Sequence, residues 1–225
     1  IASITAIVSL VSYNGMKKLE NKFKIVIESA PLIESAVNMK LLVGQDIIAV
    51  MKLMAALDTE ELDIIWKEHE ANITRFDLYK QGILQGATLK AKTIFPAKDD
   101  TLRKIVLETG NFHEQEFRPS FKIAYEQMTL QLSAESYDYE ILDTIDEKII
   151  EMGLALTQRL DKVIEISEGL IVQAEKDVQT EKARANALLL AATLIGIAGA
   201  LSLGIIISGK VTGPVKKAAE FTQII

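Results

Sequence analysis

The sequence contains no cysteine. Disulfide bonds, zinc–thiolate sites and covalently attached haem are therefore excluded. Histidine is almost as scarce, with two residues in 225, and there are only four prolines. A chain of this length without disulfides has to hold its fold by packing, and it is long enough to bury a core.

One stretch lacks charge altogether. Residues 185–208 contain no Asp, Glu, Lys, Arg or His, and Arg184 and Lys210 flank them. About 20 residues of apolar helix cross the hydrocarbon core of a bilayer. The sequence therefore predicts a transmembrane helix over 185–208.

Residues 1–13 form a second uncharged run, which is too short to cross a bilayer by itself. Because the chain starts with Ile and not Met, we interpret this run as the outer end of a first transmembrane helix. A signal-peptide remnant or a buried amphipathic start is the alternative.

The distribution of charge predicts the orientation of the chain in the membrane. Residues 14–184 carry 22 Lys and Arg against 30 Asp and Glu, a net charge of −8, whereas residues 209–225 carry three Lys against one Glu. Basic residues favour the cytoplasmic side, so we expect a cytoplasmic C-terminus and an extracytoplasmic segment over 14–184. The acidic excess also argues against nucleic acid as a partner.

Residues 14–184 show apolar residues at every third or fourth position, which indicates helices. We expect a first helix with an apolar stripe through Val37, Gly44 and Met51, then helices over about 59–90, 101–132 and from about 137 onward, the last running unbroken into 185–208. Asp58 is the predicted N-cap of the second helix, and Pro119 predicts a kink or an offset in the third. The predicted fold is all-α, an antiparallel four-helix bundle flanked by two transmembrane helices.

Small residues recur every four positions within the predicted span, at Ala192, Gly196, Ala200 and Gly204. Such a ridge lets another helix approach closely. The alternative is that Gly and Ala are simply common in membrane helices.

The segment after the span contains Thr212, Gly213 and Pro214, followed by apolar residues at amphipathic spacing. Pro214 is suited to the first turn of a new helix. A short basic stretch of this kind before an amphipathic helix resembles the opening of a HAMP linker, here residues 209–225. Together with the two apolar segments and the helical outer region, the arrangement resembles a bacterial methyl-accepting chemotaxis receptor.

The resemblance implies a homodimer in the bacterial inner membrane, with a periplasmic sensor over residues 14–184 and a cytoplasmic HAMP linker. It implies a small-molecule ligand, no enzymatic activity, and a signal passed to chemotaxis proteins through further cytoplasmic domains. Sensor histidine kinases and membrane-bound diguanylate cyclases share this front end and remain alternatives.

Arginine side chains suit a ligand carboxylate because the guanidinium group matches its geometry. The candidates are Arg159, which interrupts the apolar stripe of the last helix, and Arg75. A solvated or interface salt bridge is the alternative for Arg159.

The two histidines, His69 and His113, both lie on apolar stripes. If the second and third helices fold back near residue 95, His69 lies level with Phe121 and His113 with Asp77. A metal site of His113, Glu116 and Asp77, or a non-covalent haem pocket, are the alternatives to histidines that are satisfied within the core. No cofactor is expected. A carboxylate-bridged metalloenzyme is disfavoured, because neither histidine follows a Glu by three positions.

Overall fold

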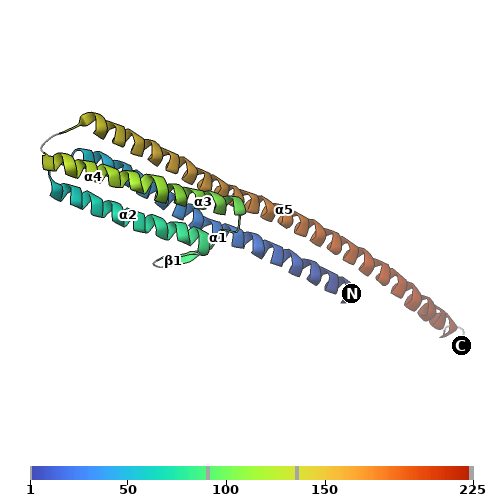
Figure 1. The fold of residues 1–225 in the computed structure, drawn as a ribbon. Helices are drawn as coiled ribbons and strands as arrows, with labels where there is room; N and C mark the ends of the chain where they lie inside the picture. Colours follow the sequence, from blue (N-terminus) through green and yellow to red (C-terminus); the bar gives the residue numbers. More distant parts are fainter. Residues whose placement is uncertain (1, 90–91, 135–136, 223–225) are drawn as a thin grey trace. The chain divides into compact units, whose positions relative to one another are not determined.

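The computed structural model describes the backbone of residues 2–89, 92–134 and 137–222. The chain is mostly helical, as predicted (Figure 1). Its helices are α1 (Ala2–Met54), α2 (Thr59–Gln85), α3 (Asp100–Phe112), the π-helical turn η1 (His113–Phe117), α4 (Arg118–Ala134) and α5 (Tyr139–Thr222).

Side-chain caps start the internal helices. Asp58 accepts a hydrogen bond from the backbone N–H of Glu61 at 2.9 Å, which confirms the predicted N-cap of α2. The Glu61 carboxylate in turn accepts from the N–H of Leu57. Asp99 caps α3 through the N–H of Leu102. These caps satisfy backbone donors that have no partner inside a helix.

The offset predicted at Pro119 is present. Immediately before this proline the backbone forms η1, in which the N–H of Arg118 bonds to the carbonyl of His113, five residues back. Proline has no N–H to donate, and a wider turn lets the helix pass it without a clash. The predicted third helix is therefore α3, η1 and α4 in succession.

The prediction of a helix reaching residue 90 is wrong, because α2 ends at Gln85. Gly86 then adopts φ = 83°, a conformation that favours glycine. A short antiparallel hairpin follows, formed by β1 (Ala87–Leu89) and β2 (Lys92–Ile94), with Ala87 opposite Ile94. The hairpin packs closely on α2, since a Cβ at Gly82 would lie 2.9 Å from Cδ1 of Ile94.

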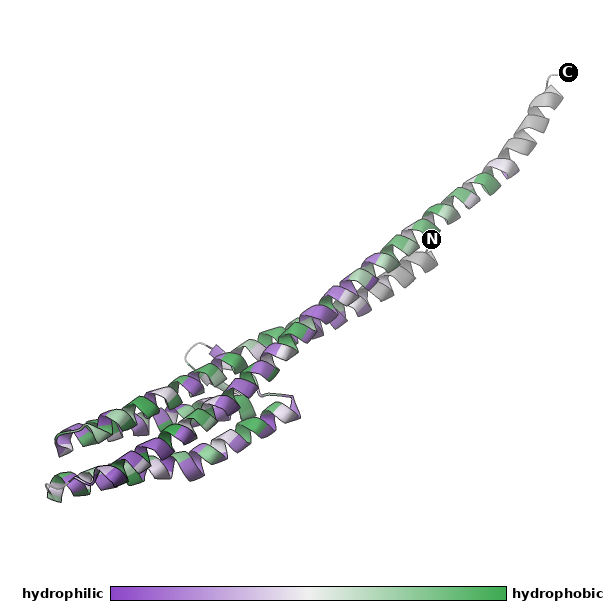
Figure 2. Ribbon diagram, turned by 90° about the horizontal axis from the view of Figure 1, so that it is seen from above, coloured by the Kyte–Doolittle hydropathy of each residue, from purple (hydrophilic) through white to green (hydrophobic). Residues whose placement is uncertain are grey.

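The chain divides into two compact units. The core unit comprises Lys24–Ala174, and the terminal unit comprises Ile1–Phe23 with Glu175–Ile225. In the core unit, stretches of α1, α2, α3 to α4, and α5 run side by side (Figures 1 and 2). They bury a common apolar core that includes Met39, Val43, Val50, Leu53, Leu62, Phe76, Phe117, Phe121, Met128, Ile149, Leu156 and Leu160.

In the terminal unit, α5 continues as an uncharged, exposed helix over residues 185–208. Within the described residues one helix is long and apolar enough to cross a membrane, and it is this one (Figure 2). Pro214 lies inside α5, which continues to Thr222. The predicted new helix therefore does not begin at this proline. Residues 2–13 belong to α1. For most of them, as for the residues after Lys210, the structure describes the backbone and not the side chains.

Candidate functional site

A polar centre lies inside the apolar core of the core unit. Asp46 from α1 is 1% exposed, and it meets His69 and Asn72 from α2, which are 0% and 8% exposed. The Asn72 side chain donates to Oδ1 of Asp46 at 2.7 Å, and Nδ1 of His69 lies 3.0 Å from Oδ2. Burying these groups costs free energy that their mutual contacts only partly return.

His69 is incompletely satisfied. Although its Nδ1 is near Asp46, the ring N–H does not point at the carboxylate, and Nε2 has no hydrogen-bond partner among the described residues. His69 and Asp46 are therefore in close contact without a hydrogen bond between them. A buried polar group of this kind is a candidate for a functional role.

Both histidines stack on phenylalanines. The rings of His69 and Phe121 lie 3.7 Å apart and nearly parallel, and those of His113 and Phe76 lie 3.9 Å apart. The predicted level of His69 with Phe121 is therefore confirmed. Phe76 directly precedes Asp77, so His113 also lies at its predicted level.

Burial lowers the pKa of His113 from its ordinary value of 6.5 to about 4. The negative charge of Asp77 opposes this effect, whereas the electrostatic influence of His69, Lys80 and Arg118 lowers the pKa of His113 further. His113 is therefore uncharged at neutral pH. It acts as an aromatic core residue in this unit rather than as a cation.

The predicted metal set does not assemble. Glu116 is exposed while His113 is buried, and Asp77 pairs with Lys80 at 2.6 Å. The described residues contain no group of three or more His, Asp or Glu side chains placed to hold a metal ion. The π-helical turn changes the helix phase between His113 and Glu116, so their i, i+3 spacing no longer gives a shared face. The haem alternative stays a prediction.

The two candidate arginines differ in their surroundings. The guanidinium of Arg159 lies over the Phe112 ring, 4.9 Å from its centre, and the side chain is half-buried. Arg75 on α2 is exposed and has no hydrogen bond or ion pair within the described part of the chain. Arg75 is therefore free for a ligand, whereas Arg159 already has a cation–π partner.

Arg75 lines a surface groove of about 820 Å³ between α1, α2 and the hairpin. An ion pair of Lys92 with Glu34, at 2.6 Å, ties the hairpin to α1 beside it. Arg75 also lines an adjoining hollow of about 430 Å³ along α1 and α2. The remaining walls of the groove combine polar and apolar side chains, including Ser35, Asn38, Leu78, Tyr79, Thr88, Leu89 and Ile94.

A second apolar stripe runs along the exposed side of α1. Its large members are between 48% and 58% exposed, and a Cβ placed on Gly44 in their midst would meet nothing within 4 Å. Their spacing alternates between three and four residues, as in a helix–helix seam. The stripe comprises Val37, Leu41, Gly44, Ile48 and Met51.

The small-residue ridge predicted in the apolar helix has no partner within the described chain. A Cβ placed on Gly196 or Gly204 would also meet nothing within 4 Å, and Ala192 and Ala200 likewise lie on solvent-accessible parts of α5. The ridge is thus open to another helix, and its packing role stays a prediction.

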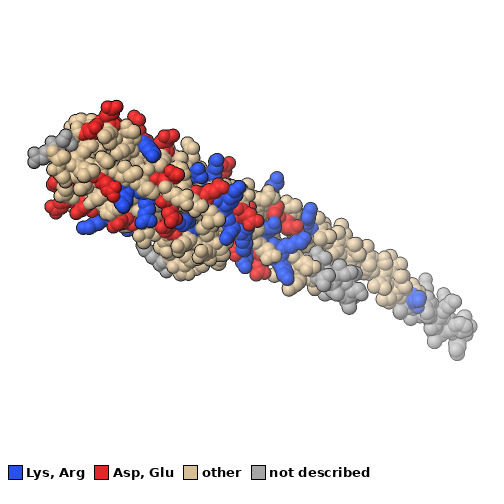
Figure 3. All heavy atoms as spheres, in the orientation of Figure 1, with Lys and Arg blue, Asp and Glu red and all other residues tan. Residues whose placement is uncertain are grey.

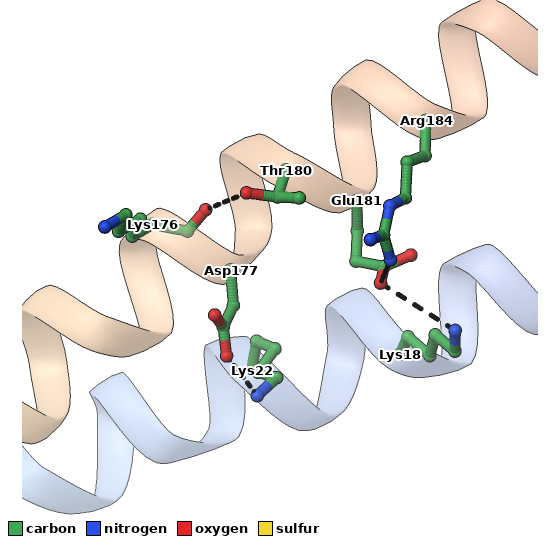
Figure 4. Close-up of polar contacts among 7 residues, drawn as sticks. All are labelled: Lys18, Lys22, Lys176, Asp177, Thr180, Glu181 and Arg184. Atoms are coloured by element: carbon green, nitrogen blue, oxygen red, sulfur yellow. Dashed lines mark hydrogen bonds and ion pairs between the residues drawn. The ribbon is translucent and has the colours of Figure 1, made fainter.

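Ion pairs join α1 and α5 in the terminal unit, next to the apolar helix (Figure 4). Lys22 pairs with Asp177. Glu181 pairs with both Lys18, at 3.8 Å, and Arg184, at 3.2 Å. This cluster is not among the sites predicted from the sequence, although Lys18 and Lys22, like Asp177 and Glu181, are spaced i, i+4 and so share a helix face.

Comparisons with known proteins add no relative. No protein-family model matches the chain, and neither curated proteins nor solved structures give a significant match.

Proposed function

We propose that this chain is the sensing and membrane-crossing part of a transmembrane signal transducer, and specifically of a methyl-accepting chemotaxis receptor. The observation that carries the proposal is the continuity of α5. This helix supplies buried residues such as Ile149 and Leu160 to the core unit, continues through the uncharged stretch 185–208, and extends to Thr222. A helix of this kind joins an outer domain to the inside of the cell without a flexible joint.

In this proposal the core unit is an antiparallel four-helix bundle that stands outside the inner membrane. The start of α1 and residues 185–208 are the two spans, and residues after 208 lead into a HAMP linker in the cytoplasm. The basic residues after the span favour this orientation.

The receptor is a homodimer in this proposal. The exposed stripe on α1, from Val37 to Met51, supplies apolar residues at the spacing of a two-helix seam. Within the membrane, the ridge from Ala192 to Gly204 supplies a face on which a second helix packs closely.

The groove at Arg75 is the proposed sensing surface. The free guanidinium of Arg75 and the mixed polar and apolar lining of the groove suit a small ligand that carries a carboxylate. The buried polar centre at Asp46 lies on the same two helices, α1 and α2. Two packings of a helical bundle need differ by only a few kcal/mol, so a ligand bound at the groove could favour one of them.

The orientation can be tested directly because the chain has no cysteine of its own. We expect a single cysteine at Gln158 to react with a membrane-impermeant maleimide in intact cells, and one at Gln223 to react only after the membrane is opened. Equal labelling of both positions in intact cells would contradict a membrane-spanning chain.

Signalling is tested with a chimera. Residues 1–225 are joined to the cytoplasmic part of a methyl-accepting receptor, and the activity of its associated kinase is measured. A disulfide between two copies of Ile48→Cys is expected to change kinase activity, whereas the same change at Leu130 on α4, which is equally exposed, is expected to have no effect. Kinase activity that is unchanged by both crosslinks would contradict the transducer proposal.

A further inference from the structure

The ion-pair cluster of the terminal unit lines a hollow of about 390 Å³ between α1 and α5. Figure 4 shows its side chains converging from the two helices. Lys18, Asn21 and Lys22 come from α1, and Asp177, Glu181 and Arg184 come from α5. Its chemistry is therefore charged and hydrogen-bonding rather than apolar.

The cluster carries one positive charge in excess. Lys22 and Asp177 neutralise each other, but Glu181 is shared by Lys18 and Arg184. These two cations remain 63% and 68% exposed, while Glu181 is only 21% exposed. The excess charge is thus presented outward, and a group with a single negative charge would balance it.

If residues 185–208 span the membrane as proposed, helix geometry gives the depth of the cluster. At about 1.5 Å per residue, Arg184 lies about 1.5 Å and Glu181 about 6 Å outside the first residue of the uncharged stretch. Lipid headgroups occupy a layer of about 5–7 Å on each side of the hydrocarbon core. Lys18 pairs with Glu181, so it lies at the same level. In the proposed arrangement the two exposed cations therefore lie at the depth of the lipid phosphates.

The sequence, like the cluster, is net positive next to the uncharged stretch and net negative farther from it. Residues 14–23 and 175–184 together carry six Lys and Arg against four Asp and Glu, a net charge of +2. Residues 24–174 carry 16 against 26, a net charge of −10. Figure 3 shows both basic and acidic side chains up to the start of the uncharged part of α5. Taken together, the stretches of the outer region next to the proposed membrane are thus net basic, whereas the rest of that region is net acidic.

We propose that Lys18, Asn21 and Arg184 form a binding site for the phosphate of an anionic phospholipid in the outer leaflet of the inner membrane. A phosphodiester carries one negative charge, which matches the excess of the cluster, and arginine binds phosphate oxygens through two N–H groups. The bound lipid bridges α1 and α5 where both leave the membrane. This inference rests on the proposed membrane-spanning function.

The test uses the full chain in lipid nanodiscs that contain phosphatidylglycerol and phosphatidylcholine in equal amounts. Lipids that stay bound when the protein is released are counted by native mass spectrometry. We expect bound phosphatidylglycerol to be enriched, and each of Lys18→Gln and Arg184→Gln to reduce the enrichment about fivefold. Lys182→Gln is the matched control, because Lys182 is exposed on the same turn of α5 but does not line the hollow.

Three results would overturn the site. One is the absence of enrichment, and another is an equal loss in the Lys182→Gln control, which would indicate general surface attraction. The third is displacement of the lipid by inorganic phosphate in excess, which would indicate a site for the free anion. A chain that does not enter the discs would instead refute the proposed function, so the two failures are distinguishable.

Discussion

The buried His113 predicts how the stability of the core unit depends on pH. Its pKa is 6.5 in an exposed chain and about 4 when it is buried against Phe76. Above pH 6.5 the side chain is neutral in both the folded and the unfolded state, so it adds no penalty. As the pH falls from 6.5 toward 4, the unfolded chain binds a proton that the folded chain excludes, and stability is lost.

The size of the effect follows from the two pKa values. Each pH unit between them is worth about 1.4 kcal/mol, so the full loss is about 3 kcal/mol by pH 4. His113→Phe removes the titrating group and retains an aromatic ring against Phe76. We therefore expect this variant to lose less stability than the native chain over the same pH range, by up to about 3 kcal/mol.

The measurement is urea unfolding of the full chain in detergent micelles, followed by the fluorescence of Trp66. Trp66 is the single tryptophan, and its ring lies 5.6 Å from that of His69 and 6.2 Å from that of Phe121. The signal therefore reports the core unit and not the apolar helix. Parallel pH dependences in the native chain and His113→Phe would refute the assignment of a depressed pKa to this residue.

Three further changes test other parts of the structure. Asp46→Ala leaves His69 and Asn72 without their partner, and we expect it to lower the free energy of unfolding by about 2–4 kcal/mol in the Trp66 assay; a loss below 1 kcal/mol would contradict the energetic importance of the polar centre. Ile48→Glu places a charge on the exposed stripe of α1 and is expected to shift the proposed dimer to monomer in sedimentation. Gly196→Leu is expected to weaken disulfide crosslinking between cysteines in the apolar helices of two copies, and unchanged crosslinking would mean that the ridge faces elsewhere.

The helical character of the chain could be predicted because it depends on local rules. Apolar periodicity located the helices, Asp58 identified one start, and Pro119 identified the offset. The hairpin after Gly86 was missed, since it requires only six paired residues and the glycine that precedes it also fits a helix packing face. Short strands of this kind have no periodicity to detect.

The face of α1 that is buried could not be chosen correctly. The predicted stripe mixed the two faces. Val37 and Met51 lie on the exposed side, whereas Ile47 and Met54, which the stripe also included, pack against the core. The buried face itself is formed by residues that the stripe left out, among them Met39, Val43 and Val50. Both stripes are apolar and both have helical spacing, so periodicity alone does not rank them. The presence of Asp46 among the inward positions made that stripe look less hydrophobic than it is.

The candidate site was only partly visible for a related reason. His69 and His113 were recognised because histidine is rare, and their levels followed from the fold-back near residue 95. Asp46 and Asn72 were missed because polar residues are common on helix surfaces. The position of Asp46 between Val43 and Val50, at core spacing, was the one signal that could have identified it.

The continuity of α5 also restricts how the length of this chain can change. Each residue inserted between 174 and 185 would turn everything beyond it by about 100° and advance it by about 1.5 Å. Seven inserted residues rotate the following part of the helix by only about 20° from its original direction, whereas one, two or five inserted residues turn a different face of that part toward its neighbours. Related chains should therefore differ in this stretch by whole heptads, so helix phase, more than residue identity, is the property that this part of the chain has to preserve.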